Sequence, residues 1–205
     1  MSETKRLSIF PLPGAILFPG LQLPLHIFEQ RYRDLVGSAL AKDRLIGMVQ
    51  PQRSGEGSPL YEIGCLGRIG DVEAMEDGRY NIVLEGETRF RVLRELEVTT
   101  AFRQVEAELI DDPQNEVLAS VERAGFEFEA KRFAAMQGYS VDWDSVERLD
   151  DETLINGVAQ IAPFDSAAKQ ALLEANSLSE RCELMIQLMQ FFALRDDGDE
   201  IVTLQ

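Results

Sequence analysis

The stretch LSIFPLPGAILFPGLQLPLHIFEQRY, residues 7–32, decides the fold of the N-terminal half of the chain. Its four prolines exclude a helix or a central strand, because proline has no main-chain N–H and fixes φ. The short apolar runs between them predict strands at 8–10, 16–18 and 21–28, joined by tight turns. From residue 29 the apolar period becomes helical, so we predict a helix over 29–42 that covers the strands.

The β pattern continues as far as residue 110. We predict strands over 44–50, 61–75, 80–85, 88–98 and 100–110, with an Asp-Gly hairpin turn before residue 80. Gly86 separates the third of these from the fourth. Three evenly spaced glycines in 61–75 indicate bulges or sharp bends: Gly64, Gly67 and Gly70. Periodicity alone therefore predicts a small, mostly antiparallel β domain.

Asp111-Asp112-Pro113 is the predicted domain boundary, because β patterning stops there. Helices are predicted over 115–137, 152–161 and 166–175, followed by a last helix after Ser177, with Asp144 and Asp151 as N-caps. In the first of these helices we expect the buried side to hold Val117, Leu118, Val121, Ala124, Phe128 and Phe133. The predicted organisation is α+β: a β subdomain at 1–112, a helical bundle at 113–195 and an acidic tail at 196–205.

Composition narrows the classes of function. The chain has 205 residues and a formal charge of −16, which opposes binding to nucleic acid or to acidic membranes. Its N-terminus lacks the apolar core of a signal peptide, and no stretch approaches the ~20 apolar residues of a membrane span. We therefore expect a cytoplasmic protein in which Cys65 and Cys182 are buried thiols, with a disulfide between them as the alternative.

The sequence predicts no catalytic residues, no cofactor and no metal. His26 is the single histidine, and within a proline-flanked strand we expect it to be packed or to act as a cap. One histidine and two distant cysteines do not make a zinc site, and no phosphate-binding loop is present. Paired carboxylates such as Asp150-Asp151 stand at predicted helix ends, where capping explains them. A glycosidase-like acid pair remains an alternative.

Three stretches resemble one family, the substrate-binding domain found at the N-terminus of Lon proteases. The first carries Phe10, Pro11, Leu12, Leu17, Phe18, Pro19, Gly20, Leu23, Pro24, Leu25, Phe28, Glu29, Arg31 and Tyr32. The second carries Ile63, Gly64, Arg68, Ile69, Asp77, Gly78, Glu85, Gly86, Arg89 and Phe90. The third carries Lys169, Gln170, Leu172, Leu173, Glu174, Leu178, Arg181 and Leu184. The resemblance implies that the β portion is a pseudo-barrel. It also implies a standalone recognition part of a protease, without the ATPase and peptidase modules.

Large apolar residues in or beside turns, or on an irregular helix face, are the candidate site: Phe18, Leu21, Phe126, Phe133, Met136 and Trp143. Either they close the seam between the β and helical halves, or some of them line a groove for extended or unfolded polypeptide. The leading hypothesis is a non-catalytic protein- and peptide-binding module resembling the Lon domain. The alternatives are a small-molecule-binding or enzymatic pocket at the junction of the two subdomains, and an adaptor for a separate ATP-dependent protease.

Overall fold

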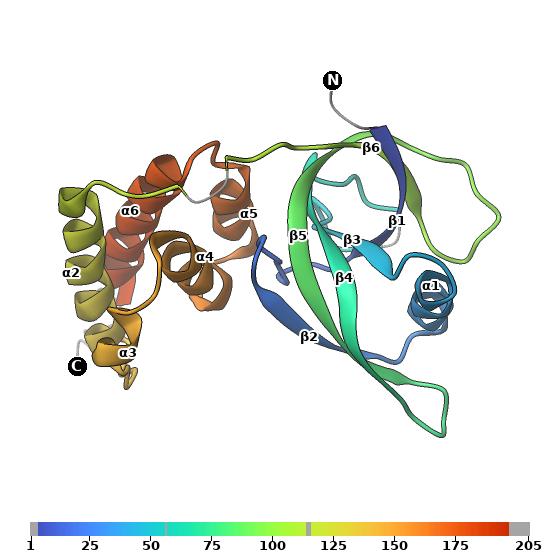
Figure 1. The fold of residues 1–205 in the computed structure, drawn as a ribbon, viewed down its shortest axis with the longest axis horizontal. Coiled ribbons are helices and arrows are strands. Elements are labelled where there is room, and N and C mark those ends of the chain that lie inside the picture. Colours follow the sequence, from blue (N-terminus) through green and yellow to red (C-terminus); the bar gives the residue numbers. More distant parts are fainter. Residues whose placement is uncertain (1–3, 56, 114–115, 197–205) are drawn as a thin grey trace, which may run out of the picture. The chain divides into compact units, whose positions relative to one another are not determined.

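The computed structural model describes residues 4–55, 57–113 and 116–196. The chain divides into two compact units, which we call unit 1, Met1–Asp112, and unit 2, Pro113–Gln205. Figure 1 shows that the first is built mainly of strands and the second of helices. No described helix combines the length and the apolar character needed to cross a bilayer.

Unit 1 is a mixed six-stranded sheet with one helix. Its elements are β1 (Thr4–Pro11), β2 (Gln22–Ile27), α1 (Gln30–Leu40), β3 (Leu45–Val49), β4 (Ile63–Ala74), β5 (Tyr80–Glu95) and β6 (Gln104–Leu109). The strand order is β2-β5-β4-β3-β1-β6, and β6 also pairs with β5, so five strands form a ring (Figure 1). Among the described pairings only β1–β3 is parallel. These elements confirm the predicted α+β class.

Strand β5 joins three other strands and is the centre of the sheet. It pairs with β4 along most of its 16 residues, with β2 through 80–85 and with β6 through 90–95. The predicted interruption at Gly86 is wrong, because the strand runs through it. A Cβ on Gly86 would lie 2.1 Å from the Phe18 carbonyl oxygen, so the missing side chain lets the preceding segment approach the strand. Gly20 and Gly86 are joined there by an N–H···O bond of 2.9 Å.

Strand β4 bends where its glycines lie. Its register with β5 shifts between Leu66 and Gly67 and again between Ile69 and Val72. A Cβ on Gly64 would lie 2.5 Å from the Phe90 ring. The predicted bulges or bends are therefore confirmed, and the Phe90 ring lies where a side chain on Gly64 would be.

The segment between β1 and β2 is not a strand. Ile16, Leu17 and Phe18 are all buried, although they are consecutive. A strand directs neighbouring side chains to opposite faces, whereas this segment buries every one of the three. The predicted strand at 16–18 is therefore wrong, while the expected burial is right.

Unit 2 contains five helices in its described residues: α2 (Ser120–Met136), α3 (Trp143–Val146), α4 (Asp151–Ile161), α5 (Ser166–Glu174) and α6 (Leu178–Asp196). The predicted start of the first helix, Asn115, lies outside the described residues, as do 197–205 of the predicted tail. The N-caps of α3, α4 and α5 are Asp142, Asp150 and Asp165, in that order. Each carboxylate accepts a hydrogen bond from the main-chain N–H three residues later. The cap predicted at Asp144 is two residues too late, and the cap predicted at Asp151 is one residue too late.

Helix α2 buries a different face from the predicted one. The buried residues are Phe126, Ala130, Phe133 and Ala134. Val121 and Phe128 are 78% and 66% exposed. The predicted stripe is right for Leu118 and Phe133 and wrong for its other members.

A buried arginine joins three helices of unit 2. Arg181 on α6 donates from Nη1 to Asn156 Oδ1 on α4 (2.8 Å) and from Nε to the Leu172 carbonyl oxygen on α5 (2.9 Å). A cation is favourable at the carbonyl end of a helix such as α5. Hydrogen bonds from one buried side chain therefore link α4, α5 and α6.

Candidate functional site

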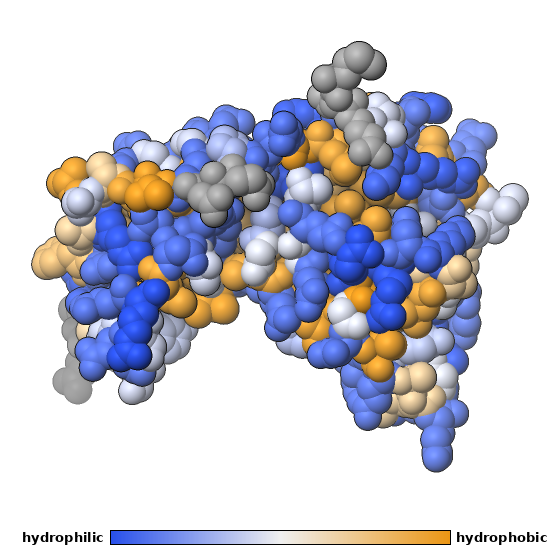
Figure 2. All heavy atoms as spheres, in the orientation of Figure 1, coloured by the Kyte–Doolittle hydropathy of each residue, from blue (hydrophilic) through white to orange (hydrophobic). Residues whose placement is uncertain are grey.

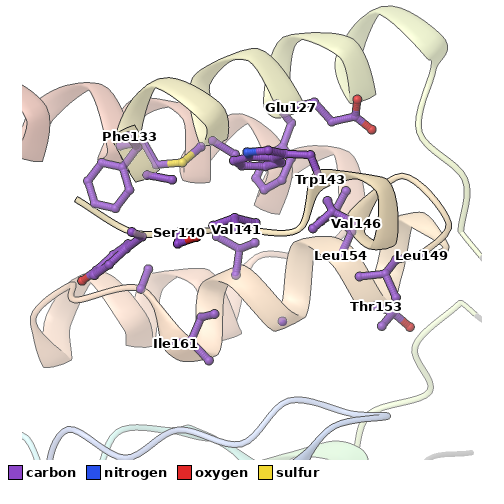
Figure 3. Close-up of a pocket in the computed structure, with 18 of the residues that line it drawn as sticks. Glu127, Phe133, Ser140, Val141, Trp143, Val146, Leu149, Thr153, Leu154 and Ile161 are labelled. Carbon is purple, nitrogen blue, oxygen red and sulfur yellow. The ribbon is translucent and has the colours of Figure 1, made fainter. Parts of the chain in front are cut away.

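An apolar pocket of about 800 Å³ lies within unit 2, between α2 and α4. Figure 3 shows the segment with Ser140 and Val141 running between the two helices, with Trp143 on the α2 side and Ile161 on the α4 side. Large apolar side chains make most of the lining, among them Phe126, Phe133, Trp143, Val146, Leu154 and Ile161.

Gly138 reverses the chain after α2 and so creates one wall of the pocket. Its φ of +69° is a conformation that favours glycine. The N–H groups of Gly138 and Tyr139 donate to the Ala135 and Ala134 carbonyl oxygens, at 3.2 and 2.8 Å. Glycine in this conformation just after the last turn is a common helix ending. The chain can then turn back toward α4.

The wall carries free main-chain groups. Within the described part of the chain, neither the N–H nor the C=O of Ser140 and Val141 has a hydrogen-bond partner. Val141 is half-buried and Ser140 is exposed. The pocket is thus bordered by donors and acceptors of the kind that a second main chain can pair with.

The mouth of the pocket exposes apolar surface to water. Ile161 is 80% exposed, Tyr139 52% and Leu149 39%. Gly157 on α4 adds room, since a Cβ placed there would meet nothing within 4 Å. Trp143 is half-buried, and its ring lies 5.5 Å from the Lys131 ammonium group. A hollow of this size and character suits bulky aliphatic or aromatic groups.

The six candidate residues from the sequence separate into two groups. Phe126, Phe133 and Trp143 line the pocket, whereas Met136 lies on α2 outside its lining and is 39% exposed. Phe18 is fully buried and Leu21 half-buried, both in unit 1. The sequence analysis did not name Tyr139, Leu149 and Ile161 as site residues. They are large apolar residues in or near a stretch that has no long predicted helix, and this property could have identified them.

The two cysteines and the single histidine lie outside the pocket. Burial raises the pKa of the Cys65 thiol far above its usual range and that of Cys182 to about 11, so both stay protonated at neutral pH. His26 is exposed on β2, with Nδ1 2.7 Å from Asn81 Oδ1, so the expectation that it is packed is wrong. Within the described residues no group of three or more His, Cys, Asp or Glu is placed to hold a metal ion.

Comparison with known proteins decides the family. The model of the ATP-dependent protease La (LON) substrate-binding domain matches residues 6–190. The chain belongs to the Lon substrate-binding domain family.

Full-length Lon proteases are among the relatives. Lon protease of Anaeromyxobacter dehalogenans is 30% identical over 194 residues, and Lon protease 2 of Myxococcus xanthus is 28% identical over 193. Each alignment covers 89% of this chain and 23% of the relative. The chain therefore spans about a quarter of the length of the Lon proteases that it matches.

Solved Lon domains share the fold. The Lon N-terminal domain protein from Xanthomonas campestris superposes with a TM-score of 0.67 and 22% identity, covering 91% of this chain and 98% of its own. The N-terminal domain of the Mycobacterium avium complex Lon protease gives the same TM-score at 21% identity, covering 96% and 100%. The fold of the Lon substrate-binding domain is thus found along nearly the whole chain.

Proposed function

We propose that this Lon-family chain is a non-catalytic polypeptide-binding module, and that the unit 2 pocket receives apolar side chains of an extended or unfolded segment. The observation that carries the proposal is the apolar pocket bordered by the free main-chain groups of Ser140 and Val141. Apolar side chains would supply affinity in the pocket, and main-chain hydrogen bonds would favour a polypeptide over other apolar ligands. Membership of a substrate-binding domain family agrees with this role.

The proposed partners are unfolded or extended polypeptides. With its acidic charge the module is expected to act in the cytoplasm, away from nucleic acid and membranes. A role as adaptor for a separate ATP-dependent protease stays a prediction, which co-purification with an ATPase would test.

Trp143 makes the proposal testable without a label, because it is the only tryptophan and lines the pocket. Titration with a short peptide containing Leu and Phe should change its fluorescence in a saturable manner. Mass spectrometry should find the peptide intact afterwards, as expected for binding without cleavage.

Gly157 allows the pocket to be filled from inside. Gly157→Leu projects a side chain into the open space beside α4 and should weaken peptide binding about tenfold or more. Gly157→Ala is the matched control, because it adds one methyl group and should leave most of the affinity. Equal affinities for the two variants, or a peptide that is cleaved, would contradict the proposal.

A further inference from the structure

The acidic excess of the chain is concentrated in unit 2. Residues 113–205 include 18 acidic and 7 basic residues, a formal charge of −11, whereas residues 1–112 include 18 acidic and 13 basic, a formal charge of −5. The sequence on one side of the pocket follows this bias. Carboxylates at 142, 144, 147 and 150 alternate there with the pocket-lining Trp143, Val146 and Leu149.

Two of these carboxylates, Asp142 and Asp150, have lowered pKa values and are therefore charged at neutral pH. Ser145 holds the pKa of Asp142 below its usual value by hydrogen bonds from its hydroxyl and N–H, and the N–H and hydroxyl of Thr153 do the same for Asp150. These hydrogen bonds lie at the N-caps of two helices, and their donors have no positive charge. Within the described residues the Asp144 carboxylate has no ion-pair partner.

Most nearby cations are already engaged. Arg123 lies 2.8 Å from a Glu127 oxygen and 2.5 Å from an Asp151 oxygen. Arg132 lies 3.3 Å from Glu129, and the Lys131 ammonium group is shared between Glu147, at 3.7 Å, and the Trp143 ring. Arg148 is the remaining cation between α2 and α4. With Arg148 counted against the four carboxylates, residues 141–150 have a formal charge of −3.

We infer that the pocket selects polypeptide segments in which a bulky apolar residue is flanked by lysine or arginine. This rests on the proposed function and adds the charge of the partner. The apolar side chain enters the hollow, while the flanking cations lie beside the carboxylates of Asp142, Asp144 and Asp150. Acidic segments of equal hydrophobicity are disfavoured by like-charge repulsion.

The test uses the full chain and three capped octapeptides with the same central Leu-Phe pair. The flanks are two lysines, two glutamines or two glutamates on each side, and Trp143 fluorescence gives the affinity. We expect the lysine peptide to bind about five- to tenfold more tightly than the glutamate peptide at low salt, and the difference to shrink as salt screens exposed charges.

A matched pair of charge reversals locates the effect. Asp144→Lys beside the pocket should lower the preference for the lysine peptide severalfold. Glu183→Lys changes an exposed residue of the same unit that is not part of the pocket lining, and should alter the preference much less.

The outcomes separate the two proposals. Equal binding of all three peptides, or equal effects of the two reversals, would overturn charge selection and leave the polypeptide-binding proposal standing. Absence of binding by every peptide would overturn the binding proposal itself and, with it, the charge preference. Tighter binding of the glutamate peptide would reverse the inference.

Discussion

Unit 1 and unit 2 differ in the contacts of their charged side chains and in the exposure of their large apolar side chains. Across the sheet, arginines pair with carboxylates of neighbouring strands, as in Arg68–Glu87 of β4 and β5 and Arg94–Glu106 of β5 and β6. Unit 2 also has ion pairs, such as Arg123–Asp151, but three of its other carboxylates serve as helix caps. Eleven large apolar residues are exposed among the described residues, and eight of them belong to unit 2.

The two units also differ in where their exposed apolar surface lies. Five of the six strands of unit 1 close into a ring through the β5–β6 pairing, with β2 at an edge. The exposed large apolar residues in the described part of unit 1 are Phe28, Val72 and Leu93. Unit 2 leaves apolar side chains at the pocket mouth, and Figure 2 shows hydrophobic surface over α2 as well. Such surface is typical of an interaction site. This contrast supports the proposal that the binding surface lies in unit 2.

The largest expected effect tests how α2 divides its apolar residues. Phe126→Ala, at a side chain with no exposed surface, should lower the free energy of unfolding by about 3–5 kcal/mol. Phe128→Ala, at 66% exposure, should change it by no more than about 0.5 kcal/mol. Urea denaturation followed by Trp143 fluorescence reports on unit 2. Similar losses from both variants would mean that the two sides of α2 are equally buried.

The next effect tests the ion pairs of unit 1. Arg89 donates to both carboxylate oxygens of Asp112, at 2.8 and 2.6 Å, and its side chain is 5% exposed. Asp112→Ala leaves this charge buried without its carboxylate, so we expect a loss of about 3 kcal/mol.

The control for that pair is an exposed one. Glu62 and Arg91 are 74% and 48% exposed, and Glu62→Ala should cost less than about 1 kcal/mol. Urea unfolding followed by far-ultraviolet circular dichroism would compare the two variants. A cost for Asp112→Ala as small as the control would show that ion pairing does little for the sheet.

The smallest effect tests the carboxylate caps of unit 2. Asp150→Ala should cost about 1 kcal/mol at pH 7, because the N–H of Thr153 loses its acceptor. The Thr153 hydrogen bonds lower the pKa of Asp150 from 3.8 in the folded state, so its contribution is complete above pH 3.8 and is lost as the pH falls through the lower folded value.

Asp150→Asn keeps an acceptor but does not titrate. Its stability relative to the native chain should therefore rise as the pH falls below 3.8, which urea midpoints at pH 7 and at acid pH would measure. A constant difference between the two proteins would show that the cap does not depend on charge.

The sequence predicts unit 1 better because its signals are local. Prolines, the Asp-Gly turn and strict alternation each act over a few residues, and they located every strand of the sheet. The errors lie where tertiary contacts decide. The segment 16–18 buries three consecutive residues, and Gly86 gives room for the close approach of residue 18 without ending the strand.

Helix α2 shows why the candidate site was only partly predictable. Its core face combines the small Ala130 and Ala134 with two phenylalanines, while Val121 and Phe128 are exposed to water. A search for helical periodicity gives more weight to the larger apolar residues, so it predicts that the wrong side of α2 is buried. The short segment that forms the other wall of the pocket has no period at all, so the meeting of Phe126, Phe133 and Trp143 needed the structure.

The pairing of β1 with β6 affects how the nascent chain matures. Thr4 lies opposite Glu108, so β1 leaves the ribosome about 100 residues ahead of this partner strand. At bacterial or eukaryotic synthesis rates of roughly 5–20 residues per second, that delay is roughly 5–20 s. During this interval the backbone of β1 lacks its neighbour on one side, and an unpaired strand edge of this kind is prone to aggregation until β6 is made.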